Sequence, residues 1–275
     1  MATVAGTPDF TQRRPDLLSG TPRAHAIDRW IFVFMAAWFI ALVLAGFIPS
    51  SLTKIAAVQS GERPPFPLVM HMHAVLMGAF LALLLAQTWL MATGRTRYHM
   101  RLGMISWVLV PAIVIVGLIL APTMYHEILG RLQVAPPDMR DKLQKALLFS
   151  ENIKLIQLRI GILFPLFLAI AFRARGRDAG LHKRMMILAT AIPLPAGIDR
   201  IPWLPKTLPD SPLSPDLYIL LAIAPMFVWD VMRNRSIHRA YWIWLILCLP
   251  PTIAVHALWD TPWWHATARA LMGVS

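Results

Sequence analysis

Four histidines lie near the same end of the predicted membrane helices, where their ring nitrogens could ligate a metal. They are His71, His73, His126 and His256. Neutral imidazoles from different helices at a matched depth can bind haem iron from both sides, or hold copper or zinc. A soft ion such as copper would also suit the nearby thioethers of Met70, Met72, Met77 and Met124. We therefore predict a metal site built from His71 or His73 together with His126 and His256.

For haem b, the predicted binding residues are His73, His126 and His256, with Arg159 placed against a negative group such as a propionate. The alternative is that each histidine lies at the membrane interface and bonds a carbonyl, while the methionines are apolar filler. The sequence contains no HExxH, CxxC or HxxxH motif. Its single cysteine, Cys248, excludes a disulfide framework and a cysteine-based metal site.

One helical stripe connects the histidines to a second polar residue. The stripe contains His73, Met77, Phe80, Leu84 and Gln87, because steps of three and four follow the 3.6-residue helical period. His71 points nearly the opposite way. We therefore expect His73, and not His71, to face the helix bundle.

Arg159 is predicted about two turns into a membrane helix, where an arginine requires a counter-charge. Asp199 is predicted at a similar depth on the next helix, so we predict an ion pair between Arg159 and Asp199. The pair would either lock two helices together or contribute to anion binding or gating.

The composition identifies the class of protein that positions these groups. Hydrophobic residues make up 57% of the chain and charged residues 15%, which is too apolar for a soluble domain of 275 residues. The net charge of +12 does not indicate nucleic-acid binding, because the basic residues concentrate at helix ends. The predicted fold is an all-α polytopic membrane bundle whose main partner is the lipid bilayer.

The apolar runs predict one seven-helix transmembrane domain over residues 30–258. Its helices are expected at 30–49, 67–92, 100–124, 153–172, 184–201, 215–232 and 241–258. A short amphipathic helix is expected on the outer surface from Asp138 onward. Pro193, Pro195 and Pro225 predict kinks in the fifth and sixth helices. Residues 1–29 are interpreted as a mobile basic tail, and residues 259–275 as an interfacial segment.

Basic residues in short loops orient the bundle. Fifteen of the 26 Lys and Arg residues fall in four clusters on one side, in ranges 13–29, 95–101, 173–184 and 233–239. Short basic loops stay in the cytoplasm. The sequence therefore predicts a bacterial inner-membrane protein with its N-terminus cytoplasmic and its C-terminus outside.

A near-repeat occurs in two of these basic loops. Gly94-Arg95 precedes His99-x-Arg101, and Gly176-Arg177 precedes His182-x-Arg184, with spacings that differ by one residue. Both duplication and convergent loop chemistry explain the pattern. In either case His99 and His182 would cap a helix or contact lipid phosphate.

The runs HAVLMGAFLALLLAQTWLMATGRTRYHMRLG and LHKRMMILATAIPLPAGIDRIPW resemble uncharacterised bacterial multi-pass membrane proteins over about residues 67–205. In layout the chain is distantly similar to b-type cytochromes of the ferric-reductase kind. That resemblance implies haem ligands at the positions of His73, His99 and His182. His73 lies toward the predicted outer face, whereas His99 and His182 lie toward the inner face.

Three classes of function remain open from the sequence. The first is a haem-binding or metal-binding protein for electron transfer near the outer face. The second is an ion- or proton-coupled transporter or channel that uses Arg159, Asp199 and His73, with the proline-broken helices moving. The third is a structural or assembly subunit, with a membrane-protein partner or as a homo-oligomer. The sequence leaves enzymatic activity open, and it contains no evident pairing of a nucleophile with a base.

Overall fold

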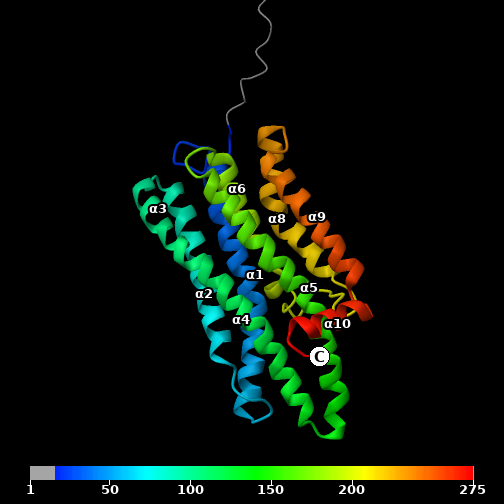
Figure 1. Cartoon of the computed structure of the whole chain (residues 1–275). Coiled ribbons are helices and arrows are strands. Elements are labelled where there is room, and N and C mark those ends of the chain that lie inside the picture. The colour runs from blue at the N-terminus through cyan, green and yellow to red at the C-terminus, as the bar shows by residue number, and fades with distance from the viewer. Residues whose placement is uncertain (1–15, 275) are drawn as a thin grey trace, which may run out of the picture.

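The computed structural model describes residues 16–274, and the described part contains helices and no strands. Figure 1 shows the long helices side by side in one bundle. In chain order the α-helices, long and short, are α1 (Ala26–Gln59), α2 (Leu68–Ala92), α3 (Thr96–Leu102), α4 (Ser106–Gln133), α5 (Pro137–Ala174), α6 (Ala179–Ala191), α7 (Pro195–Ile198), α8 (Leu213–Asn234), α9 (Arg239–Leu258) and α10 (Pro262–Leu271). The predicted all-α fold is confirmed.

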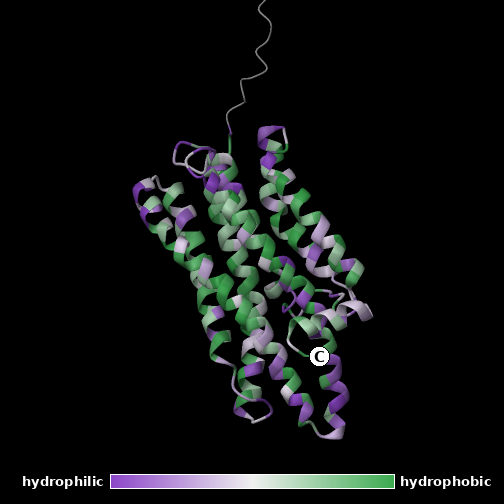
Figure 2. Cartoon of the chain, viewed as in Figure 1, coloured by the Kyte–Doolittle hydropathy of each residue, from purple (hydrophilic) through white to green (hydrophobic). Residues whose placement is uncertain are grey.

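Six helical segments of the described chain are long and apolar enough to cross a membrane. They are α1, α2, the continuous stretch Thr96–Gln133, α5, α8 and α9. Figure 2 shows apolar residues over the middle of the bundle and more polar residues at its two ends. This pattern is that of a multi-pass membrane protein, as the sequence predicted.

The helix expected at 184–201 is broken in two. α6 ends at Ala191, the chain turns through Pro193, and α7 covers only Pro195–Ile198. Proline removes a helical hydrogen bond and clashes with the preceding turn, which explains the break. α6 packs against α1, α5, α8 and α9. The break itself is packed inside protein, since Ile192, Leu194 and Ile198 are 2–4% exposed.

Three helices are longer than the sequence indicated, including α4, which continues past residue 124 to Gln133. The amphipathic helix expected from Asp138 and the span expected at 153–172 form one helix, α5, of 38 residues. No glycine or proline interrupts residues 138–152, so nothing ends the helix there. At 1.5 Å per residue α5 is about 57 Å long, well beyond the hydrocarbon thickness of about 30 Å. α1 likewise continues past residue 49 to Gln59.

The expected mobile tail is packed against the bundle in its described part. Leu18 has no exposed surface and belongs to the main hydrophobic core with Phe32 and Phe39. The backbone N–H of Gly20 donates to the carbonyl of Asp28. Residues 1–15, which include Arg13 and Arg14, lie outside the described residues. Residues 16–20, here called the N-terminal strap, therefore form part of the fold.

A close glycine contact fixes α7 against α1. A Cβ atom added at Gly46 would lie 1.9 Å from the carbonyl oxygen of Gly197, and one added at Gly197 would lie 3.2 Å from the Cα atom of Val43. The backbones of the two segments therefore touch. This contact holds the break after Pro193 in place, because neither side has a flexible side chain that could move away.

We expect Gly46→Ala to lower the free energy of unfolding by about 1–3 kcal/mol, because the added methyl group overpacks a backbone contact. Thermal unfolding of the purified protein would measure this loss. Gly78→Ala is the control, since a Cβ atom there meets nothing within 4 Å. Equal melting temperatures for the two variants would contradict the close α1–α7 contact.

Candidate functional site

The four outer histidines predicted to bind a metal have separate surroundings. Nε2 of His126 donates to the carbonyl of Met272 over 2.9 Å, and Nε2 of His256 lies 2.9 Å from Oδ2 of Asp216. His71 is exposed. His73 is half-buried, and its Nδ1 has no hydrogen-bond partner in the described structure. Within residues 16–274, no three His, Cys, Asp or Glu side chains group as metal ligands.

Arg159 has a carboxylate partner, but the partner is Asp216 and not Asp199. Nη2 of Arg159 lies 2.6 Å from Oδ1 of Asp216, and Nη1 donates to the hydroxyl of Thr252 over 3.0 Å. Asp216 belongs to the first turn of α8. Asp199 follows the break at α7, and its buried Oδ1 lacks a hydrogen-bond partner among the described residues. The turn after Pro195 places Asp199 away from the guanidinium that it was predicted to neutralise.

A second polar cluster joins α10 to the long helices. Glu151, on α5, is 1% exposed and accepts a hydrogen bond from the Tyr125 hydroxyl over 3.1 Å. Nδ1 of His265 lies 2.6 Å from its other carboxylate oxygen, and the indole of Trp264 donates to its carbonyl. Every oxygen of Glu151 is therefore occupied, which makes this cluster an anchor for α10.

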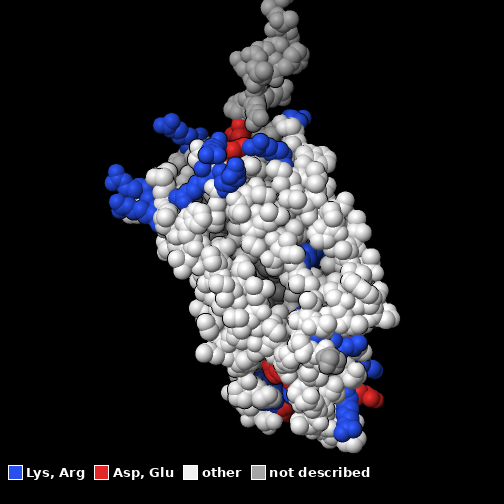
Figure 3. Space-filling model, viewed as in Figure 1, with Lys and Arg blue, Asp and Glu red and all other residues white. Residues whose placement is uncertain are grey.

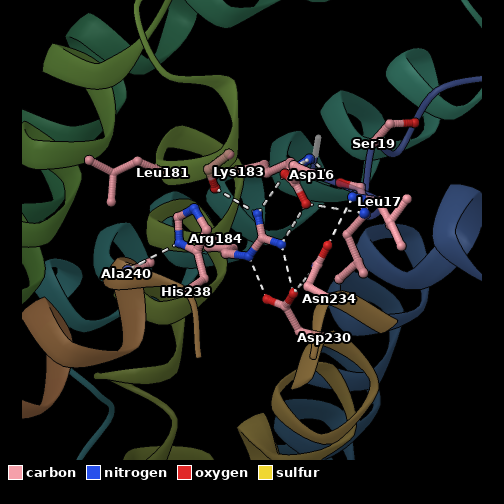
Figure 4. A network of polar contacts seen from close by, with 12 residues as sticks. Asp16, Leu17, Ser19, Leu181, Lys183, Arg184, Asp230, Asn234, His238 and Ala240 are labelled. Atoms are coloured by element: carbon pink, nitrogen blue, oxygen red, sulfur yellow. Dashed lines mark hydrogen bonds and ion pairs between the residues drawn. The ribbon is translucent and has the colours of Figure 1, made fainter. Parts of the chain in front are cut away.

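At the opposite end, the basic loops surround a fully buried arginine. We call this the basic end; it contains residues 93–101, 174–184 and 235–238. On the face shown in Figure 3, Lys and Arg residues gather there, and the middle of the bundle is almost free of charge. Arg184 has no exposed surface and lies between two carboxylates, those of Asp16 and Asp230 (Figure 4).

Arg184 bonds both carboxylates in a bidentate manner. Its Nη1 and Nη2 lie 2.9 Å from the two oxygens of Asp16, and its Nη2 lies 2.8 Å from Oδ1 of Asp230. The Tyr241 hydroxyl donates to Asp230 over 2.8 Å, and the Asn234 amide donates to it over 2.7 Å. The network thus joins the N-terminal strap, α6, α8 and α9.

The strap is held by charge as well as by packing. Nζ of Lys183 lies 2.7 Å from Oδ2 of Asp16 and also donates to the carbonyl of Leu18. Burial alone would raise the pKa of Asp16, but the hydrogen bonds and charges of Arg184 and Lys183 outweigh it and hold that pKa well below its usual value. Asp16 therefore remains a carboxylate at neutral pH.

The two copies of the near-repeat adopt the same local structure. Gly94 follows α2 and Gly176 follows α5, each with φ of 77°, a left-handed conformation that favours glycine. Nδ1 of His99 lies 3.3 Å from the carbonyl of Gln87. Nδ1 of His182 lies 2.8 Å from the carbonyl of Ala171. Each histidine thus bonds back to the helix that precedes its glycine turn.

Both histidines line one cavity of about 160 Å³ at the basic end, here called the basic-end cavity. Its apolar wall includes Phe32, Phe80, Leu83, Leu84, Phe172, Met186 and Ile187. Its polar groups include Ser19, Gln87, Thr88, His99, Ser106, Arg175, His182 and Lys183. Ser19 and Gly20 of the strap close part of the wall, so the Arg184 network also shapes this cavity.

The side-chain amide of Gln87 is the unexplained group in this cavity. Both its nitrogen and its oxygen are buried, and neither has a hydrogen-bond partner within the described residues. An unsatisfied buried polar group costs about 1–3 kcal/mol. Gly103 lies beside this amide, because a Cβ atom there would be 3.4 Å from Nε2 of Gln87. Gly103 therefore lines the cavity within van der Waals range of an amide without a partner.

The charges around the cavity are positive. No Asp or Glu side chain is among its described lining residues. Lys183 is paired with Asp16, whereas Arg175 donates to the carbonyl of Met100 and has no ion pair in the described structure. The sequence had indicated that Gln87 faces protein, but it assigned His99 and His182 to helix capping or lipid contact. The one sequence feature that pointed to these two histidines together was the near-repeat of Gly-Arg followed by His-x-Arg.

Comparison with known proteins does not identify a family for this chain. No family model matches it, and neither a curated protein nor a solved structure matches it. The basic-end cavity is therefore the candidate site on the strength of its lining residues alone.

Proposed function

We propose that the chain is an integral protein of a bacterial inner membrane that binds a small organic ligand in the basic-end cavity. The observation that carries this proposal is a largely apolar cavity lined by two histidines and by Gln87, whose buried amide has no hydrogen-bond partner in the described structure. Ligand sites are concave and mostly apolar, with a few convergent polar groups. A cavity of about 150 Å³ can hold a benzene ring, and this one has a similar size.

The proposed topology follows from the distribution of charge. The basic end faces the cytoplasm because its arginines lie in short loops. α6 and α7 together form a seventh, broken crossing, which places the N-terminus inside and the C-terminus outside. Support for this crossing comes from α8, which begins toward the end opposite the basic loops and returns to them (Figure 1).

A second candidate is a redox centre of copper or haem b held by His99 and His182. The observation that favours it is the pair of Nδ1 hydrogen bonds to backbone carbonyls, because metal-bound histidines usually orient their second nitrogen in this way. A bound centre would supply electron transfer. The uncompensated charge of Arg175 opposes a bare metal cation, and the cavity is smaller than a porphyrin requires.

Filling the cavity tests the proposal. We expect benzene at tenfold excess over its Kd to stabilise the purified wild type by about 1.4 kcal/mol, as a rise in melting temperature. Gly103→Leu should abolish this rise, since the backbone φ of −60° accepts a side chain that then occupies the cavity. Gly78→Leu is the matched control, because its position opens on free space.

An equal benzene effect in wild type and Gly103→Leu would mean that the ring binds elsewhere, and the proposal would fail. Visible spectra and metal analysis of the same samples address the second candidate. A Soret band or stoichiometric copper that disappears in His99→Leu and His182→Leu would replace the organic ligand by a metal centre.

A further inference from the structure

We infer that the basic-end cavity is built for an aromatic ring that carries hydroxyl groups, the chemistry of phenols and hydroquinones. This inference rests on the proposed function and names the class of its ligand. It depends on three features of the cavity: the hydrogen-bonding state of two imidazoles, the amide of Gln87, and the apolar wall.

The first feature is that two histidines lining the cavity each have one ring nitrogen that is an acceptor without a partner. A carbonyl oxygen can only accept, so Nδ1 of His99 donates to Gln87 and Nδ1 of His182 donates to Ala171. In a neutral imidazole the other nitrogen then carries a lone pair. Neither Nε2 has a hydrogen bond to any described residue, and both rings line the cavity. A ligand that satisfies both nitrogens must therefore donate two hydrogen bonds.

The second feature is the amide of Gln87, which offers one acceptor and two donor hydrogens. A hydroxyl group donates one hydrogen bond and accepts others, so it can pair with an imidazole and with the amide at once. A carboxylate only accepts, and it would leave both Nε2 lone pairs without a donor. An ammonium group would donate, but the nearby guanidinium of Arg175 would repel its charge.

The third feature is the shape of the apolar part. Phe80, Leu84 and Ile187 form a wall of a cavity that has about the volume needed for a single six-membered ring. A flat ring buries its faces against such a wall and presents its substituents at the edge. Together the three features select a ring with hydroxyl donors over an amine, a metal cation or a bare hydrocarbon.

Three matched rings test the inference on the full-length protein in detergent, under anaerobic conditions that keep hydroquinone reduced. Calorimetric titration compares benzene, phenol and hydroquinone. Each hydroxyl should tighten binding about threefold to tenfold, the effect of one net hydrogen bond. His99→Leu and His182→Leu should each remove one of these steps, and Gln87→Leu should weaken phenol relative to benzene. His71→Leu, which alters an exposed histidine far from the cavity, should leave all three affinities unchanged.

The ratio of affinities within one variant is the deciding quantity, because it does not depend on how stable that variant is. Equal Kd values for benzene and hydroquinone in the wild type would overturn the hydroxyl inference and leave the proposed ligand site standing. A ratio unchanged by His99→Leu, His182→Leu and Gln87→Leu would also overturn it. Failure of all three rings to bind would remove both the inference and the proposed function.

Discussion

Replacing Arg184 with Met is expected to lower the free energy of unfolding by about 3–5 kcal/mol, the largest effect of any single change at the basic end. The side chain is fully buried, and Met keeps most of its volume. Its loss leaves Asp230 buried without a counter-charge, held only by the Tyr241 hydroxyl and the Asn234 amide. An unpaired buried carboxylate carries a large desolvation cost.

Arg177→Met is the matched control, because it removes the same charge from an exposed position just before α6. Exposed charges contribute little, so its effect should stay within about 0.5 kcal/mol. The double variant Arg184→Met with Asp230→Leu should recover part of the loss, since no buried charge then lacks its partner. Thermal unfolding of the purified wild type, the two single variants and the double variant measures these changes in the free energy of unfolding. A loss in Arg184→Met as small as that of Arg177→Met would contradict the network in Figure 4.

The same variant reports on the N-terminal strap. Arg184 and Lys183 are the two cations that hold Asp16, and Ser19 of the strap lines the cavity. Loss of Arg184 therefore weakens one wall of the proposed ligand site as well as the bundle. For this reason the ligand experiments use variants of lining residues and leave the Arg184 network intact.

Much of the helical architecture could be predicted from the sequence, because membrane helices are set by local apolar runs. α2, α8 and α9 begin and end close to the predicted residues. The predicted helix boundaries are wrong where the local sequence pattern does not determine whether a helix ends or continues. The amphipathic pattern of residues 138–152 predicts a separate surface helix, yet without a helix breaker these residues continue into α5. Pro193 and Pro195 predicted a kink, and they produce a complete break.

The site was less accessible to sequence reasoning than the fold. The near-repeat marked His99 and His182, but nothing local shows that two turns about 80 residues apart open on one cavity. Ion-pair partners have the same difficulty. Asp199 and Asp216 are both acids near the predicted outer side, and the choice between them depends on how α7 and α8 are placed around α5. Depth along a helix could be estimated, whereas rotation between helices could not.

The choice of partner leads to a double-variant test of Arg159. Arg159→Leu is expected to cost about 3–5 kcal/mol, since it leaves Asp216 beside the apolar interior with only His256 as a partner. Adding Asp216→Leu should restore part of that loss, a coupling of about 0.5–3 kcal/mol for residues in direct contact. Adding Asp199→Leu instead should simply sum the two single effects, because the structure places no contact between Asp199 and the guanidinium. Melting temperatures of the three single and two double variants provide both couplings under identical detergent conditions. Coupling to Asp199 with additivity at Asp216 would reverse the assignment, and with it the placement of α7 and α8 around α5.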